Sequence, residues 1–254
     1  MSTESARLRE MIGQAGRIVG FTGAGVSTES GIPDFRSPGG IWTRYDPRDF
    51  EFSRYVEDPE VRRRSWQMRR EFFAAAAQPN PAHLTFARLE REGRSPGVIT
   101  QNIDGLHQDA GSRTVLELHG TAREVACIGT RPQHGVPRGC GWRAPWEWAS
   151  ERVEAGDTDP GCPQCSGLVK SATISFGQML DEEVLERAAA LARSADLLIA
   201  AGSSLQVHPA AGVPLEVLRG GGRLVVLNDE PTPLDDAAAL VVRGRAGEVL
   251  GAVA

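Results

Sequence analysis

The sequence has almost no lysine, no long apolar run and no excess of positive charge. Lys170 is the one lysine among 254 residues, and the formal net charge is -5. A protein that binds nucleic acid by neutralising phosphates normally has a basic face or stripe, so this charge balance argues against that class. A mildly acidic surface is compatible with basic peptides as partners.

Membrane and export signals are missing as well. No stretch approaches the roughly 18 apolar residues that a membrane-spanning helix needs. Residues 1–14 mix charged and apolar side chains and do not form the apolar core of a secretory signal. We therefore expect a cytoplasmic protein that binds no membrane. Because 41% of its residues are hydrophobic, the chain can form one substantial core with a small module beside it.

Short apolar runs alternate with helical patterns along the chain. Buried runs of this kind, bounded by glycine and polar residues, are typical of parallel strands. Their alternation with helices predicts an α/β fold with a Rossmann-like, doubly wound parallel sheet. The strands are expected at 17–22, 97–100, 114–118, 196–201 and 223–227, and the helices at 5–15, 81–92, 181–193, 210–219 and from Gly247 onward.

Two segments interrupt this alternation. Residues 42–78 are rich in Arg, Trp and Phe at helical spacing, and residues 122–172 contain all four cysteines. Since no repeat or low-complexity linker separates them, we predict one domain, 1–254, with two lobes. The large lobe comprises about 1–41, 79–121 and 173–254, and the small lobe comprises a helical insertion (42–78) and a zinc module (122–172).

A glycine-rich loop follows the first strand. Gly23-Ala24-Gly25 begins like a dinucleotide-binding fingerprint, but Thr28 stands where that fingerprint has Gly or Ala. By itself the loop is equally compatible with a tight structural turn. The longer string, Gly23 to Ser27 followed by Ser30-Gly31-Ile32-Pro33-Asp34-Phe35-Arg36, resembles the cofactor loop of sirtuins.

Three more motifs resemble sirtuins in the family's order. They are Gln101-Asn102-Ile103-Asp104-Gly105-Leu106-His107, Leu118-His119-Gly120 and Gly202-Ser203-Ser204-Leu205, and each follows a predicted strand. Ligands of open α/β sheets bind at the carboxyl ends of strands, so polar residues there are good functional candidates. The resemblance extends from Ile18 to the C-terminal turn.

The resemblance implies that NAD is the co-substrate. Asp104 and the Ile103 backbone would hold the nicotinamide carboxamide, Asn102 would contact the ribose and an ordered water, and His119 would be the catalytic base. A histidine suits deprotonation of a ribose hydroxyl near neutral pH. The implied cofactor contacts are Gly23, Ala24, Gly25, Ser27, Asp34, Phe35, Arg36, Gln101, Asn102, Ile103, Asp104, Gly202, Ser203, Ser204, Asn228, Asp229, Glu230 and Ala246.

The other histidines have structural interpretations. His83 lies near a predicted helix start, His134 lies in the cysteine-rich segment, and His208 follows the Gly-Ser-Ser-Leu motif. His107 belongs to a sirtuin motif, and we interpret it as a packing residue or a support for catalytic residues.

Substrate binding is implied by a looser match. Ile174, Ser175, Phe176 and Gly177 resemble the sirtuin segment beside which the substrate peptide adds as a strand. Trp66-Gln67-Met68-Arg69 stands where one sirtuin subclass has a Tyr and an Arg that bind acidic acyl groups. Because the tyrosine is absent, we interpret Arg69 as a solvated surface residue and expect acetyl or other neutral acyl groups.

The four cysteines predict a structural zinc ion. Without an export signal, cysteines are more often metal ligands than disulfides. Cys162 and Cys165 have the spacing of a zinc knuckle, whereas twelve residues, 128–139, separate Cys127 from Cys140. The simplest account is a loop inserted into the first knuckle, with all four cysteines as ligands; the alternatives are His134 replacing a cysteine or a lost site. Four thiolates leave no open coordination position, so such an ion would be structural.

The resemblance implies removal of acyl groups from protein lysine, with nicotinamide and O-acyl-ADP-ribose as products. We expect the protein to be a monomer. An ADP-ribosyltransferase or NAD hydrolase on the same scaffold is an alternative, as is a module that senses NAD or ADP-ribose. The presence of both Asn102 and His119 argues against the sensor, because binding alone needs no base.

Overall fold

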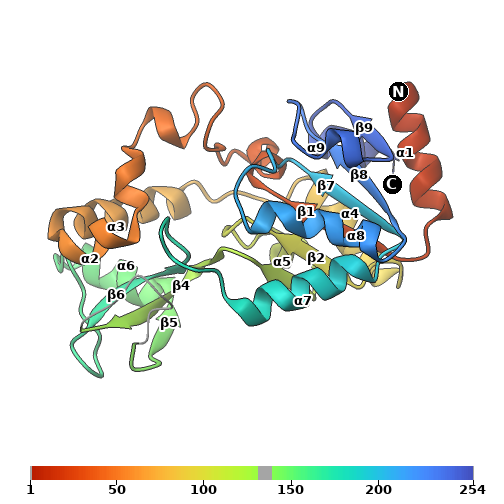
Figure 1. Cartoon of the computed structure of the whole chain (residues 1–254). Coiled ribbons are helices and arrows are strands. Elements are labelled where there is room, and N and C mark those ends of the chain that lie inside the picture. The colour runs from red at the N-terminus through yellow and green to blue at the C-terminus, as the bar shows by residue number, and fades with distance from the viewer. Residues whose placement is uncertain (1, 131–138, 254) are drawn as a thin grey trace.

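A six-stranded parallel sheet forms the centre of the molecule. The computed structural model describes residues 2–130 and 139–253, and Figure 1 shows the whole chain. The strand order is β3-β2-β1-β7-β8-β9, and each neighbouring pair is parallel. The strands are β1 (Ile18–Thr22), β2 (Gly97–Thr100), β3 (Val115–Glu117), β7 (Leu197–Ala201), β8 (Arg223–Leu227) and β9 (Leu240–Val242).

Helices cover both faces of this sheet and bury its apolar side chains. One core cluster joins the sheet to α1 (Thr3–Gln14), α4 (Pro81–Arg91) and α9 (Ala246–Val253). The other joins it to α7 (Glu182–Arg193), α8 (Glu216–Arg219) and the 3₁₀ helix Ala210–Leu215. Strands β1, β7 and β8 are buried almost throughout. The predicted doubly wound α/β class is confirmed.

The order of the strands creates a switch point next to β1. The chain leaves β1 for β2 on one side of it, and β7 lies on the other side. In such sheets, the loops at the carboxyl ends of the strands diverge at the switch point and leave room for a ligand. The loops that follow β1, β2 and β7 contain the glycine loop, the Gln-Asn-Ile-Asp motif and the Gly-Ser-Ser-Leu motif.

The predicted helix over 210–219 differs in form. The structure has a 3₁₀ helix, Ala210–Leu215, followed by the four-residue helix α8. Pro214 lies inside this segment, and a proline has no N–H to donate to an α-helical hydrogen bond. The remaining predicted helices of the large sheet agree with α1, α4, α7 and α9 to within a few residues.

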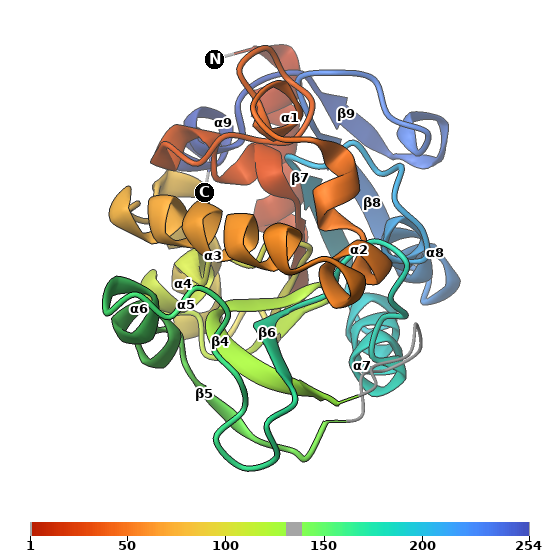
Figure 2. The same cartoon turned by 90° about the vertical axis from the view of Figure 1, so that its left-hand side faces the viewer.

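A second, three-stranded antiparallel sheet lies at the end of the molecule away from the termini. Its order is β5-β4-β6, and it carries helix α6 (Trp146–Glu154). Figure 2 shows α3 in front, with this sheet below it. Trp66 of α3 stacks on Trp146 with ring centroids 6.1 Å apart, so the two insertions share one core. The elements are α2 (Phe52–Glu57), α3 (Pro59–Ala74), β4 (Gly120–Gly129), β5 (Arg143–Pro145) and β6 (Leu168–Thr173).

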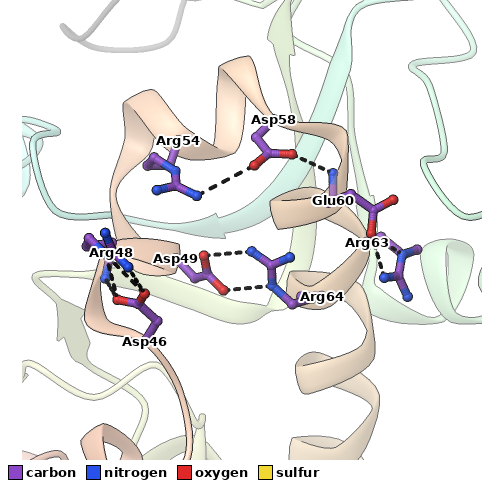
Figure 3. Close-up of polar contacts among 8 residues, drawn as sticks. All are labelled: Asp46, Arg48, Asp49, Arg54, Asp58, Glu60, Arg63 and Arg64. Atoms are coloured by element: carbon purple, nitrogen blue, oxygen red, sulfur yellow. Dashed lines mark hydrogen bonds and ion pairs between the residues drawn. The ribbon is translucent and has the colours of Figure 1, made fainter.

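Ion pairs cover the surface of the helical insertion (Figure 3). Arg64 joins α3 to Asp49 of the preceding 3₁₀ helix at 2.8 Å, and Arg63 pairs with Glu60 at 2.5 Å. Exposed pairs of this kind contribute roughly 0–1 kcal/mol each, so they do not hold the insertion in place. Tyr55 is buried and donates its hydroxyl to the Val169 carbonyl at 2.7 Å, which ties α2 to β6.

The surface interpretation of Arg69 is wrong. The side chain is buried, with its guanidinium 5.9 Å from the Phe72 ring centroid, and burial lowers its pKa to about 10. Lys170 is buried near it and donates to the Thr173 carbonyl at 2.6 Å. Burial, and then the positive charge of Arg69, lowers the pKa of Lys170 to about 7. Helical spacing alone did not predict burial because α3 packs against the second insertion, which lies far away in the sequence.

Candidate active site and zinc site

Two glycine-containing loops lie against each other at the carboxyl edge of the large sheet. The N–H of Gly25 donates to the Gly202 carbonyl at 2.8 Å, and the N–H of Gly23 donates to the Ala201 carbonyl at 3.2 Å. Gly202 has φ +61°, and a Cβ there would lie 2.2 Å from the Val26 nitrogen. Because no side chain fits between the loops, their backbones pack directly and form one continuous floor.

The loop after β2 is held to the glycine loop by buried side-chain hydrogen bonds. The Asn102 amide donates to the Gly23 carbonyl at 3.1 Å and to the Ser27 hydroxyl at 3.0 Å. Ser27 in turn donates to Asp104 Oδ2 at 2.7 Å. The other carboxylate oxygen of Asp104 accepts from the Leu106 N–H at 2.9 Å. Four predicted site residues, Gly23, Ser27, Asn102 and Asp104, therefore form one network.

The same edge of the sheet connects the predicted ribose and phosphate residues. Gln101 donates to the Ser203 hydroxyl at 2.8 Å, and Arg36 donates to the Ser204 hydroxyl at 3.2 Å. Asp34 accepts from the Arg36 backbone N–H at 2.9 Å and so shapes the turn that carries this arginine. Hydroxyls, an amide and a guanidinium that converge on glycine-rich backbone are suited to the ribose and pyrophosphate of a dinucleotide.

His119 lies after β3, directly beside the β2 loop. Its Nδ1 lies 2.9 Å from the Gln101 carbonyl, which is an acceptor, so Nδ1 carries a proton in this contact. In the neutral ring Nε2 is then unprotonated and able to act as a base. Burial lowers the pKa of His119 below its ordinary 6.5, opposed by the hydrogen bond to Gln101. The imidazole is therefore mostly neutral at pH 7.

Two further histidines are packed beneath the site. His107 is buried and lies 2.9 Å from the Thr22 hydroxyl, and the rings of His83 and His107 are 4.8 Å apart. His83 Nδ1 accepts from the Asn80 N–H at 3.2 Å, as part of the capping box of α4. Burial lowers the pKa of His83 to about 4 and that of His107 well below its usual value. The geometry agrees with their interpretation as structural residues. His134 lies outside the described residues.

The predicted adenosine residues follow β8. Asn228 donates to the Glu230 carbonyl at 2.9 Å, and Arg243 donates to the same carbonyl at 2.9 Å, which fixes the loop containing Asp229. Ala246 is buried at the start of α9. The carboxylate of Glu29 accepts from the Gly247 N–H at 2.5 Å and thereby links the glycine loop to that helix.

The predicted substrate segment connects the end of β3 with the helical insertion. Ile174 donates its N–H to the His119 carbonyl at 2.8 Å, while Phe176 donates to the Phe50 carbonyl at 3.0 Å and accepts from the Phe52 N–H at 2.9 Å. The Phe176 backbone is therefore already paired with the helical insertion. An added peptide strand would therefore pair with the predicted neighbours Ser175 and Gly177 rather than with Phe176.

An aromatic contact between cofactor loop and substrate segment was missed from the sequence. Trp42 lies 5.1 Å from Phe35 and 6.0 Å from Phe176, measured between ring centroids. Trp42 lies at the start of the helical insertion, where the sequence gave no signal of this contact beyond the tryptophan itself. Glu29 was missed for another reason, since its partner Gly247 is 218 residues away.

The four cysteines gather in the small lobe. Their sulfur atoms lie within 4.8 Å of one another, with Cys127 and Cys165 at 3.5 Å and Cys140 and Cys162 at 3.6 Å. Four Zn–S bonds of 2.3 Å at tetrahedral angles place sulfurs about 3.8 Å apart, so the cluster fits a structural zinc ion. Most of the loop that separates Cys127 from Cys140, residues 131–138, lies outside the described residues.

Two hollows are present in the described part of the surface. One of about 410 Å³ is lined by Asp104, Arg123, Ile32 and aromatic residues of the small lobe, and so reaches the predicted nicotinamide end of the site. The other, of about 330 Å³, lies at the amino ends of the strands, around Asp196 and Arg223, and none of the predicted site residues lines it.

A doubly wound sheet with this glycine loop, a histidine beside it and a four-cysteine module defines one class of protein. The chain belongs to that class, the Sir2 family, whose model matches residues 23–209.

The chain is similar to individual relatives along nearly its full length. The chain is 50% identical over 249 residues to NAD-dependent protein deacetylase 1 of Bradyrhizobium diazoefficiens, covering 96% of this chain and 93% of the relative. It is 49% identical over 238 residues to NAD-dependent protein deacetylase 2 of Streptomyces coelicolor, covering 92% and 94%. A solved Sir2 complex with a p53 peptide and NAD+ superposes with a TM-score of 0.85 at 36% identity, covering 100% and 97%.

Proposed function

We propose that this protein is an NAD-dependent protein-lysine deacylase, which moves the acyl group from a lysine side chain to ADP-ribose. Relatives that are half identical over almost the whole chain are named NAD-dependent protein deacetylases. The observation that carries the proposal is the environment of His119: Nδ1 anchored on the Gln101 carbonyl, Nε2 left as the basic nitrogen, and the Asn102 and Asp104 network beside it.

The chemistry assigns a task to each part of the site. The acyl oxygen of the modified lysine attacks the ribose carbon as the bond to nicotinamide breaks, and a ribose hydroxyl must then lose its proton. His119 accepts that proton because its lowered pKa keeps it neutral. Asn102 contacts the ribose, and Asp104 with the Ile103 backbone binds the carboxamide. Gln101, Ser203, Ser204 and Arg36 hold the ribose and phosphates.

The zinc ion has no place in this reaction. Four thiolate ligands leave no coordination position for water or substrate, so the ion would stabilise the three-stranded sheet. Cys127 lies on β4 and Cys162 in the hairpin before β6, so one ion joins both parts of the module.

The structure raises a question about the acyl group. We keep acetyl and other neutral acyl groups as the proposed substrates, since Trp66 and not a tyrosine precedes Arg69 by one helical turn. Arg69, however, is buried, and its Nε has no hydrogen-bond partner among the described residues. A buried guanidinium of this kind favours a nearby anion, which makes acidic acyl groups a necessary comparison.

The test is a panel of peptides that differ only in the acyl group on one lysine: acetyl, propionyl and succinyl. Mass spectrometry with and without NAD should show NAD-dependent loss of acetyl and propionyl at least about tenfold faster than loss of succinyl. A roughly tenfold ratio of rates is the effect expected from one strong polar contact. Faster removal of succinyl, lost in Arg69→Met, would overturn the proposed preference. Nicotinamide release with every peptide intact would favour an NAD hydrolase or a transferase.

We further propose that the chain acts in the cytoplasm as a monomer, on acylated proteins and without nucleic acid or membrane. No helix in residues 2–130 and 139–253 has the length and apolar character required to cross a bilayer. We also propose that the chain has two lobes, of which the smaller is formed by residues 42–78 and 122–172. Sedimentation of the purified protein at several concentrations tests the monomer directly, since a concentration-dependent mass would contradict it.

A further inference from the structure

Strand β4 holds the loop that carries the predicted nicotinamide contacts. The N–H of Ala122 donates to the Ile103 carbonyl at 2.9 Å. The next side chain along the strand, Arg123, donates from Nε and from Nη2 to the Asp104 carbonyl, each at 3.2 Å. Two consecutive carbonyls of the loop are therefore fixed by two consecutive residues of one strand.

Arg123 is itself held in place. Its Nη1 donates to Asp109 Oδ1 at 2.8 Å, and its Nη2 forms an ion pair with the other oxygen of the same carboxylate. Asp109 ends the short helix α5 (Leu106–Asp109), which begins directly after the loop. The guanidinium thus joins the carbonyl at one end of this helix to a carboxylate at its other end. A planar guanidinium presents its N–H donors in a fixed fork that fits both contacts, which the single nitrogen of an ammonium group does not reproduce.

The loop is shaped to receive this side chain. Gly105 has φ +74°, and a Cβ at that position would lie 2.0 Å from Arg123 Nε. The guanidinium therefore lies directly over the backbone of Gly105, in a space that only glycine leaves open. Gly105 and Arg123 are complementary, although one belongs to the large lobe and the other to a strand of the small sheet.

We propose that Arg123 is a positioning residue for nicotinamide. This inference rests on the proposed role of Asp104 in binding the carboxamide. Ser27 and the Leu106 N–H hold the two carboxylate oxygens of Asp104, and Arg123 holds its carbonyl. Without Arg123, the Asp104 carbonyl loses its side-chain link to β4, so the backbone that carries the carboxylate is less firmly placed toward the nicotinamide, although Ser27 and the Leu106 N–H still hold the carboxylate oxygens. The adenosine and phosphate contacts lie on other loops and do not depend on it.

The test compares two inhibitors in the deacetylation assay. Nicotinamide contains the carboxamide, and ADP-ribose lacks it. In Arg123→Met the nicotinamide concentration for half inhibition should rise about tenfold, as expected for one charge-assisted hydrogen bond, while half inhibition by ADP-ribose stays within about twofold. The nicotinamide concentration for half inhibition of Arg123→Lys should lie between those of wild type and Arg123→Met. The matched control is Arg143→Met, which removes an exposed arginine of the same sheet from its pair with Glu124.

Two results would overturn the inference. One is unchanged nicotinamide inhibition in Arg123→Met; the other is equal weakening of nicotinamide and ADP-ribose, as a general loosening of the site would give. If Arg123→Met does not fold, Arg123→Lys and Asp109→Asn take its place, with the same comparison. A wild-type protein without NAD-dependent deacetylation would contradict the proposed function instead. Arg123 is then tested by calorimetry, where the variant should bind NAD more weakly and ADP-ribose as wild type does.

Discussion

At the scale of single residues, burial decides which histidine can act as a base. His83 and His107 are enclosed under the sheet, whereas His119 stands at its edge with Nδ1 occupied by a backbone carbonyl. All three have lowered pKa values, with burial as the main cause. His83 reaches the cofactor network through a 3.5 Å contact with Ser27 but is fully buried, whereas His119 is only partly buried and can meet a substrate.

The pH profile of turnover follows from this environment. The base is active when neutral, and the pKa of His119 lies below 6.5. We predict that kcat is level above about pH 7.5 and falls as the pH drops through the lowered pKa, because protonation removes the base. Rates of peptide deacetylation between pH 5 and 8.5, with NAD and peptide saturating, measure this. An acidic limb centred above pH 6.5 would contradict it.

The sequence allowed these residues to be grouped at one edge of the sheet because they follow strands. Apolar runs precede the glycine loop, Asn102, Asp104 and His119. Parallel strands bring positions of this kind to one edge of the sheet. Arg69 and Arg123 behaved differently: their surroundings come from segments distant in the sequence, so neither burial nor partner was visible in the local pattern. The burial of Arg69 was not predicted for that reason.

At the scale of elements, every strand of the large sheet except the edge strand β9 was predicted. Strands β1, β7 and β8 have five residues each and were predicted, whereas β9 has three, Leu240–Val242, and was missed. Strand β9 acquires its conformation by pairing with β8 at the sheet edge, and three residues show no periodicity.

Helix α9 depends on a distant cap. Its N-terminal Gly247 N–H has the carboxylate of Glu29 as acceptor. We predict that Glu29→Ala lowers the free energy of unfolding by about 1 kcal/mol, because the helix end loses both its acceptor and a favourable negative charge. The free energy of unfolding of Glu29→Gln should lie between those of wild type and Glu29→Ala. Urea denaturation measures the loss.

The control for this change is Glu248→Ala in the first turn of the same helix. Glu248 is exposed and pairs with Arg245 at 3.1 Å. Its removal should change the free energy of unfolding by less than about 0.5 kcal/mol. Equal effects of the two substitutions would show that general charge, and not the contact with Gly247, stabilises the helix.

At the scale of the whole molecule, two sheets of different construction meet at the site. The large sheet is held by a continuous apolar core on both faces, whereas the small sheet has a compact core around Trp66, Trp146 and two of the cysteines. Twelve residues between Cys127 and Cys140 obscured the first half of the zinc site in the sequence, yet folding brings all four sulfurs together.

Zinc removal should therefore affect stability and activity together. We predict about one zinc ion per chain, released on denaturation, and a lower midpoint of thermal unfolding after chelation. Cys162→Ser should bind less zinc, and its midpoint of thermal unfolding should be lower even without chelator. Colorimetric zinc titration beside calorimetry measures both. Full thermal stability in protein that contains no zinc would contradict a structural ion.

The most direct test of the whole account is the stoichiometry of the products. Acetyl-lysine peptide and NAD are incubated with the wild-type protein and with His119→Ala, and nicotinamide, deacetylated peptide and O-acetyl-ADP-ribose are quantified by mass spectrometry. The account predicts equal amounts of all three with the wild type and, with His119→Ala, loss of deacetylated peptide while NAD still binds. Nicotinamide formed in excess over deacetylated peptide, or full deacetylation by His119→Ala, would contradict it.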